Sequence, residues 1–285
     1  PLANLIAVPW ISILVVPLAL IGALFSSFPL LSEGCFWVVD QALHGLWFIL
    51  EYLSQLSFAK WEQFTPAPWT LISSGLAVLL LLAPRGIPAR YLALFLFLPL
   101  FIVKAETPNS NAFSFTLLDV GQGLAASIQT KNHFLLFDTG AAFSSSFNMG
   151  DAVILPFMRS INVNKIDKLI VSHGDNDHIG GLRAILKKVK VTEIITSAPD
   201  KVSHQKIKIC RDGDRWQWDG VLFEILNPLS IKKTKKSGNN QSCVLRISTG
   251  DNAVLLTADI EKSTERRLVK EYRNRLASNI LVVPH

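Results

Sequence analysis

The first 28 residues of this 285-residue chain contain no charged side chain. About 20 consecutive apolar residues are enough to cross the hydrocarbon core of a bilayer. Pro9 and Pro17 interrupt the run, and proline is tolerated in membrane helices because neighbouring helices satisfy the carbonyls that it frees. The run therefore predicts a transmembrane helix and excludes a chain that folds as one soluble domain.

Charged residues are distributed unevenly along the chain. Residues 1–103 hold 3 of the 28 basic and 4 of the 22 acidic side chains, a net charge of −1. Residues 104–285 hold the remainder, a net charge of +7, so the overall +6 describes neither part. This distribution predicts a membrane region over residues 1–103 and a basic soluble domain over residues 104–285, which is long enough to enclose its own core.

Two shorter apolar runs, residues 69–84 and 87–103, lie in the first part. The proline, tryptophan and arginine residues at their ends are typical of membrane boundaries, although a buried hairpin of a soluble protein is an alternative. Arg85 and Arg90, which join the two runs, favour a cytoplasmic turn, which puts the soluble domain on the outer face. Residues 36–58 repeat bulky apolar side chains at helical spacing, which suits a helix in the membrane interface or one packed in a larger bundle.

From Ala112 onward, short apolar or alternating runs are separated by glycines and polar turns, a pattern that predicts β-strands. Helical periodicity covers residues 151–161, 179–189 and 261–276. The predicted strands are residues 113–120, 125–129, 133–137, 168–172, 191–196, 207–210, 221–226, 243–248, 253–257 and 280–283. Strands with helices between some of them predict a sandwich of α and β layers.

Potential metal ligands are concentrated in SHGDNDHIGG, residues 172–181, directly after a strand that we expect to be buried. They are His173, Asp175, Asp177 and His178. Alternate positions of an extended loop point the same way, and His178 at the start of a helix can turn back to the same point. These side chains repel one another and dehydrate at high cost unless a cation offsets them. Helix capping accounts for Asp177 alone, so we expect a metal site.

This segment resembles the His-x-His-x-Asp-His signature of metallo-β-lactamase-fold hydrolases, with Asp175 where the second histidine usually stands. The motifs LLDVGQGLA, LLFDTG, LLTADIE and VVPH, which begin at residues 117, 135, 255 and 282, are spaced as in the C-terminal domain of the ComEC family of DNA-uptake channel proteins. The apolar region before them is similar to the end of that family's competence membrane region. The resemblance implies an α+β chain, in which transmembrane helices precede an αββα sandwich that is truncated at its C-terminus.

The resemblance also implies a site for two divalent metal ions. His173 and Asp175 would bind one ion, and Asp177 and His178 the second. Asp259 would bridge both ions, unless it caps the helix that follows, and His285 would be the last ligand.

Other residues take supporting roles in this comparison. Asp177 would orient the attacking water as the catalytic residue, and Asp138 would support the site from a strand end, or else pair with Thr139 as a polar strand terminus. For Asp119 and Gln122 we favour a role in a turn.

The chain departs from the family pattern at two points. Aspartate in place of the second histidine makes the ligand set richer in oxygen, which favours manganese over zinc. The third histidine motif has no counterpart, because no histidine lies between His204 and His285. Asn239, Asn240 or Ser242 is then the candidate to face the site, and we take Asn240 as the supporting residue.

Basic residues near the ligand loop suit a polyanion, since positive charge steers phosphates. The densest run comprises Lys232, Lys233, Lys235 and Lys236, for which a solvated loop is an equally common alternative. Trp216 and Trp218 suit core packing, with base stacking as the alternative. Cys210 and Cys243 can pair on an oxidising outer face, which the sequence does not decide.

Our first hypothesis is a multi-pass protein of a bacterial inner membrane that acts in DNA uptake during natural transformation, with a metal-dependent nuclease domain on the outer, periplasmic face. Its partners would be incoming single-stranded DNA, membrane lipid, other components of the uptake machinery and further copies of itself. The second hypothesis is a non-catalytic module that binds DNA and guides it to the channel. The third is a membrane-tethered hydrolase of a lactam or small ester, against which the lysines argue. We take the chain as a stretch of a longer protein.

Overall fold

A computed structural model describes residues 2–56, 65–84, 90–103, 106–144, 146–229, 238–250 and 252–283. The chain forms two compact units, Pro1–Glu62 and Gln63–His285. The division at residue 103 that the charges predict stays a prediction.

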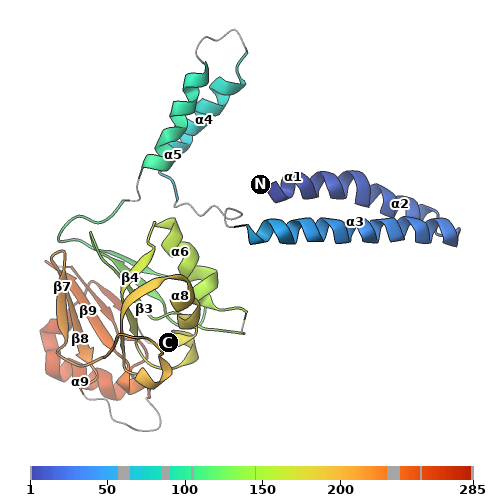
Figure 1. Ribbon diagram of the computed structural model, residues 1–285. Helices are drawn as coiled ribbons and strands as arrows, with labels where there is room; N and C mark the ends of the chain where they lie inside the picture. Colours follow the sequence, from blue (N-terminus) through green and yellow to red (C-terminus); the bar gives the residue numbers. More distant parts are fainter. Residues whose placement is uncertain are drawn as a thin grey trace. The chain divides into compact units, whose positions relative to one another are not determined.

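The first unit is a helical hairpin (Figure 1). One arm consists of α1 (Leu2–Pro9), a π-helical stretch η1 (Trp10–Val15) and α2 (Val16–Leu24); the other is α3 (Pro29–Gln55). Its helix Ala3–Leu24 has 22 residues and a mean hydropathy of 2.5, so its length and composition suffice to cross a membrane. The predicted apolar span is therefore present as a helix.

Close contacts hold the two arms of this hairpin together. The Ser32 hydroxyl donates to the Gly22 carbonyl at 2.9 Å, and the Trp10 indole N–H donates to the Ala42 carbonyl at 3.0 Å. A Cβ on Gly22 would lie 3.1 Å from Cys35 Cβ, so glycine allows the helices to approach closely. Large apolar side chains remain outside, with Trp47 and Phe48 exposed by 72% and 73%. An apolar exterior with small residues at the helix contact is typical of helices in lipid.

The second unit begins with a short helical pair. It comprises α4 (Pro68–Leu82), a 3₁₀ stretch η2 (Arg90–Phe97) and α5 (Leu98–Ile102), joined by a hydrogen bond of 2.7 Å from the Ser73 hydroxyl to the Leu96 carbonyl. These helices coincide with the two shorter apolar runs of the sequence, residues 69–84 and 87–103.

The rest of the second unit is an αββα sandwich (Figure 1). One sheet has the strand order β1-β2-β3-β4-β5-β6 and the other has the order β11-β10-β9-β8-β7. The first comprises β1 (Ser114–Leu117), β2 (Ala126–Gln129), β3 (Phe134–Phe137), β4 (Lys165–Val171), β5 (Lys190–Thr196) and β6 (Ile207–Ile209). The second comprises β7 (Arg215–Trp218), β8 (Val221–Asn227), β9 (Val244–Thr249), β10 (Asn252–Leu256) and β11 (Ile280–Val282).

Helices cover the outer face of each sheet. A π-helical stretch η3 (Gly150–Ile154), α6 (Leu155–Ser160) and α8 (Leu182–Lys188) pack on the first sheet, while α9 (Lys262–Tyr272) packs on the second. The core between the sheets includes Ile128, Phe137, Phe223 and Leu245, all fully buried. The predicted four-layer architecture is thus confirmed.

Three parallel strands position the candidate site. β3, β4 and β5 are neighbours, with Phe137 paired to Ile170 and Val171 paired to Thr196. Their carboxyl ends therefore meet at one edge, where loops of such sheets carry ligand-binding residues. Asp138, the loop from Ser172 to His178, and the segment after Thr196 all emerge there.

Several predicted boundaries were wrong for identifiable reasons. The helix predicted over residues 151–161 begins as η3, and both η3 and η1 end two residues before a proline, Pro156 and Pro17. A proline ring clashes with the carbonyl four residues earlier, which a wider turn relieves. The helix predicted over residues 261–276 stops being α-helical at Arg273, whose φ of 44° is left-handed.

Candidate metal centre

The ligand loop begins where the buried strand β4 ends. The short helix α7 (Asn176–Ile179) follows it, with Asp175 in extended conformation at the N-cap position. The backbone N–H groups of His178 and Ile179 both donate to the Asp175 carbonyl at 3.0 Å. This tight turn brings His178 back toward His173, and their ring centroids lie 4.2 Å apart.

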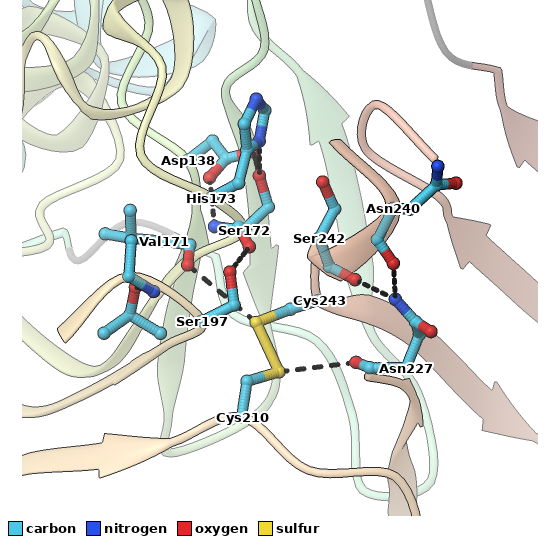
Figure 2. The surroundings of a disulfide bond; sticks show 12 residues. Asp138, Val171, Ser172, His173, Ser197, Cys210, Asn227, Asn240, Ser242 and Cys243 are labelled. Carbon is cyan, nitrogen blue, oxygen red and sulfur yellow. Dashed lines mark hydrogen bonds between the residues drawn. A yellow bond between two sulfur atoms is a disulfide. The ribbon is translucent and has the colours of Figure 1, made fainter. Parts of the chain in front are cut away.

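Asp138 anchors the loop from the end of the neighbouring strand. Its fully buried carboxylate accepts hydrogen bonds from the Ser172 N–H and Ser172 hydroxyl, each at 2.7 Å, and from His178 Nδ1 at 2.8 Å. Figure 2 shows Asp138, Ser172 and His173 in this network. Thr139 instead donates to the His178 carbonyl, so it does not pair with Asp138. A carboxylate on Nδ1 fixes the ring and leaves Nε2 for a metal.

Asp259 comes from the opposite sheet. It follows β10 after Ala258, whose φ of 47° is left-handed, as is the φ of 57° at Asp138. Left-handed backbone is costly for residues other than glycine, and it concentrates at functional sites. The turn brings Asp259 Oδ1 to 3.3 Å from His178 Nε2 and Oδ2 to 3.9 Å from His173 Nε2.

His173, His178 and Asp259 form the cluster, with one ligand atom of each lying within 4.8 Å of the others. Both imidazoles are fully buried, and His173 Nε2 has no hydrogen-bond partner among the described residues. An unsatisfied buried nitrogen is costly unless something binds it. Two imidazole nitrogens and a carboxylate oxygen are a donor set that suits zinc or manganese, so the residues fit a divalent cation.

Asp175 and Asp177 lie at the rim of this cluster. Asp175 Oδ2 is 3.6 Å from His173 Nε2, and its side chain is 55% exposed. Asp177 Oδ2 is 3.8 Å from His178 Nε2, with a side chain 26% exposed. Each aspartate therefore stands beside the histidine with which the resemblance pairs it.

Electrostatics differ between the two histidines. Burial, reinforced by neighbouring His178, lowers the pKa of His173. Burial alone would also lower the pKa of His178, but hydrogen bonds to Asp138 and Asp259 outweigh it and raise this pKa to about 10. The carboxylates thus attract positive charge to this point, whether a proton or a metal ion.

The side chain of Asn240 bonds to the beginning of α9, and its predicted supporting role at the metal site stays a prediction. Its side-chain oxygen accepts from the Glu261 N–H at 3.1 Å and the Thr264 hydroxyl at 2.7 Å, and its amide donates to the Glu261 carboxylate at 2.6 Å. Asn240 therefore caps α9.

Ser242 is the better placed of the candidates before Cys243. Its hydroxyl is fully buried without a hydrogen-bond partner among the described residues. The next residue, Cys243, donates its N–H to the Ser172 carbonyl at 2.9 Å, which joins this segment to the ligand strand. Among the lysines and the last ligand proposed from sequence, Lys232, Lys233, Lys235, Lys236 and His285 lie outside the described residues.

A disulfide between Cys210 and Cys243 lies beneath the ligand loop (Figure 2). Cys210 follows β6 of one sheet and Cys243 precedes β9 of the other, with Cα atoms 6.0 Å apart. The Ser172 carbonyl accepts both the Cys243 N–H and the Ser197 hydroxyl, the latter at 2.7 Å. The bond therefore ties the two sheets together directly behind His173.

The glycine loop before β2 closes the other side of the site. A Cβ on Gly123, whose φ is 115°, would lie 2.1 Å from the Asp177 carbonyl oxygen. Only glycine allows this approach, a role that sequence analysis did not assign. The Gly121 N–H donates to Asp119 at 3.1 Å, which makes Asp119 a turn residue. A cavity of about 390 Å³ beside this loop is lined by Asp119, Gly121, Gly123, Asp259 and Val282, among others.

Comparisons with known proteins agree with this architecture. Residues 1–87 match the Competence protein family and residues 118–280 the Metallo-beta-lactamase superfamily. Competence protein ComA of Neisseria gonorrhoeae is 34% identical over 285 residues, which is all of this chain and 39% of that protein. Ribonuclease J of Corynebacterium glutamicum is 26% identical over 154 residues, covering 50% of this chain and 20% of that protein.

Among solved structures, Rm3 metallo-beta-lactamase has a TM-score of 0.42 and 10% identity, covering 63% of this chain and 78% of that one. The superfamily fold implies binding of divalent metal, in agreement with the His/Asp cluster. The chain belongs to the metallo-beta-lactamase superfamily, and it carries a Competence protein domain ahead of that fold.

Proposed function

We propose that this chain takes part in DNA uptake across a bacterial inner membrane, and that its metallo-β-lactamase domain is a metal-dependent phosphodiesterase acting on the incoming DNA. The cluster of His173, His178 and Asp259 carries the proposal, because its buried nitrogens and carboxylate converge at one accessible edge of the sandwich. The match of residues 1–87 to the Competence protein family supports the role in uptake. The sequence likeness to a ribonuclease supports a phosphodiester substrate.

The residues of the site divide into holding, positioning and proton-transfer roles. His173, His178 and Asp259 would hold a divalent cation, and Asp175 and Asp177 would hold or complete a second one. Bound metal lowers the pKa of a coordinated water and stabilises negative charge on a phosphodiester in the transition state. Asp138 fixes the His178 ring through Nδ1, so that Nε2 faces Asp259. Asp177, at the exposed rim, would accept the proton of the attacking water.

Manganese is the metal we favour. The rim carboxylates of Asp175 and Asp177 add oxygen donors to the two imidazoles, and oxygen-rich sets shift preference from zinc toward manganese or magnesium.

Several observations support the outer face of the membrane as the domain's location. The apolar helix Ala3–Leu24 supports membrane attachment. Arg85 and Arg90 favour a cytoplasmic turn between the following runs, which makes a multi-pass arrangement. The Cys210–Cys243 disulfide suits an oxidising compartment. Contacts with lipid, with other components of the uptake machinery and between copies of the protein belong to the same proposal.

Cleavage by the full-length protein tests this function, since the chain spans 39% of its relative ComA. We expect manganese-dependent cleavage of single-stranded DNA that Asp177→Ala abolishes. Equal cleavage by that variant would refute the assignment of the site.

A non-catalytic module that guides DNA is the second candidate. The capping role of Asn240 favours it, because the oxygen of this asparagine is engaged by α9 and the missing third histidine motif is not replaced by it. Metal-independent DNA binding without cleavage under any divalent ion would support this candidate over the nuclease.

A further inference from the structure

Lys201 lies directly against the ligand loop. It ends the 3₁₀ turn η4 (Pro199–Lys201), which follows β5 at the same edge as the metal cluster. Its ammonium donates a hydrogen bond of 2.5 Å to the carbonyl of Gly174, the residue between His173 and Asp175. The side chain remains exposed, while Gly174 beneath it is buried.

Gly174 provides the room for this lysine. A Cβ at this position would lie 2.6 Å from Lys201 Cδ and 2.8 Å from Nζ. The backbone of Gly174 is outside the left-handed region, so its conformation does not require glycine. The end of the lysine stem therefore passes directly over Gly174, between the two potential ligands.

The ammonium of Lys201 retains capacity to bind an anion. An ammonium has three N–H donors, and the Gly174 carbonyl occupies one of them. Within the described residues, no carboxylate forms an ion pair with Lys201, whereas Lys168, Lys188 and Lys208 are each paired with an acidic side chain. Lys201 thus presents its ammonium at the carbonyl of Gly174, the residue after His173, without a carboxylate partner among the described residues.

We propose that Lys201 binds the backbone phosphate adjacent to the phosphate at the metal cluster, on the same DNA strand. This contact sets the register of the strand in the site. This inference rests on the proposed function, since it takes DNA as the ligand. Lysine binds phosphate as a compact point charge, and one such contact releases about 0.7 counterions from single-stranded nucleic acid.

Binding without cleavage tests the role of Lys201 separately from catalysis. The experiment measures fluorescence anisotropy of a single-stranded oligonucleotide with the full-length protein in EDTA, across about 50 to 200 mM salt. For Lys201→Met we expect the log–log salt slope to fall in magnitude by about 0.7 and the affinity to fall about fivefold at 0.1 M salt. Lys201→Arg, which keeps the charge, should restore the slope.

Lys206→Met is the matched control. Lys206 is also exposed, but it directly precedes β6, at the end of that strand away from the metal edge. An equal loss in both variants would mean diffuse attraction and would overturn the proposal, as would an unchanged slope in Lys201→Met.

Manganese affinity separates binding from support of the loop. If Lys201 only supports Gly174, Lys201→Met should weaken manganese binding, measured by electron paramagnetic resonance, without changing the salt slope; that result also overturns the proposal. If only the proposed nuclease function is wrong, the salt slope should still fall by about 0.7 in Lys201→Met, while the unaltered protein cleaves no DNA.

Discussion

Strand β4 carries polar side chains near its middle and at its carboxyl end, and the two clusters differ in how these groups are satisfied. Near the middle, the half-buried Lys168 forms an ion pair with Glu193 and lies 5.2 Å from the Trp216 ring centroid and 5.9 Å from that of Trp218. At the carboxyl end, Asp138 and Asp259 surround two buried histidines, and His173 Nε2 has no hydrogen-bond partner among the described residues. We call the cluster of Lys168, Glu193, Trp216 and Trp218 the closed end, and the cluster around His173 and His178 the metal end.

The difference shows how to separate structural from functional polar clusters in one core. At the closed end, Trp216 and Trp218 pack against the core between the sheets and cover a charge that is already neutralised, as sequence analysis favoured for them. At the metal end, two imidazoles and the Asp259 carboxylate converge within 4.8 Å, and His173 Nε2 has no hydrogen-bond partner among the described residues. A buried charge is retained in a protein when a partner or a cation compensates it.

Removing Asp259 should have the largest effect on this contrast. Asp259→Ala deletes the carboxylate that faces both histidines, so we expect manganese binding by the full-length protein to be lost in calorimetry. Glu193→Gln removes a carboxylate at the closed end and should leave the metal affinity unchanged. A similar loss in both variants would contradict the distinction between the two ends.

Breaking the disulfide should affect stability more than metal affinity. A bond that closes a loop of 33 residues should stabilise the domain by about 2–5 kcal/mol. We expect Cys210→Ser to lower the free energy of unfolding by that amount, measured by denaturant titration of the full-length protein in detergent. Cys35→Ser, which alters the free cysteine of the described chain, should leave it unchanged.

Asp138→Asn tests positioning at the metal end. The asparagine amide is uncharged and has a single oxygen, so it cannot replace the carboxylate as acceptor of these three hydrogen bonds. His178 then loses the partner that orients its ring. We expect metal affinity to fall about 10- to 100-fold, the usual effect of removing a hydrogen-bond partner of a ligand. Unchanged affinity would show that the histidine ring is held by packing alone.

Asp219, near the closed end, should give the smallest effect. Partial burial would raise the pKa of Asp219, but hydrogen bonds from Thr130 and Asn132 outweigh it and hold the pKa below its usual value. Because the folded pKa is lowered, the stabilisation is present above the unfolded pKa of about 3.9 and is lost as pH falls through the folded value. Asp219→Asn should therefore cost less than about 1 kcal/mol at pH 7, and the difference should vanish at acidic pH.

Unfolding midpoints of the two proteins between neutral and acidic pH measure this difference. A gap that grows as the pH falls would contradict the assignment for Asp219.

Much of the fold followed from the sequence because its causes are local. The apolar run 134–137 lies between polar turns and forms a buried strand, and the spacing of His173 and His178 on a strand-to-helix loop brings them together. Other features depend on distant partners. The capping bond from Asn240 to α9 spans 21 residues, and the contact of Lys201 with Gly174 joins residues 27 apart. Both π-helical stretches depended on a proline beyond the segment itself.

Whether Cys210 and Cys243 form a disulfide or remain thiols depends on whether the domain folded in an oxidising or a reducing compartment. The two cysteines adjoin strands of opposite sheets, so the bond forms where the two sheets meet. A chain kept in a reducing compartment would carry three free thiols, and one exported before folding would carry Cys35 alone. Measuring the maleimide reactivity of Cys35, Cys210 and Cys243 in unfolded protein from cells would therefore report membrane topology without any reporter fusion.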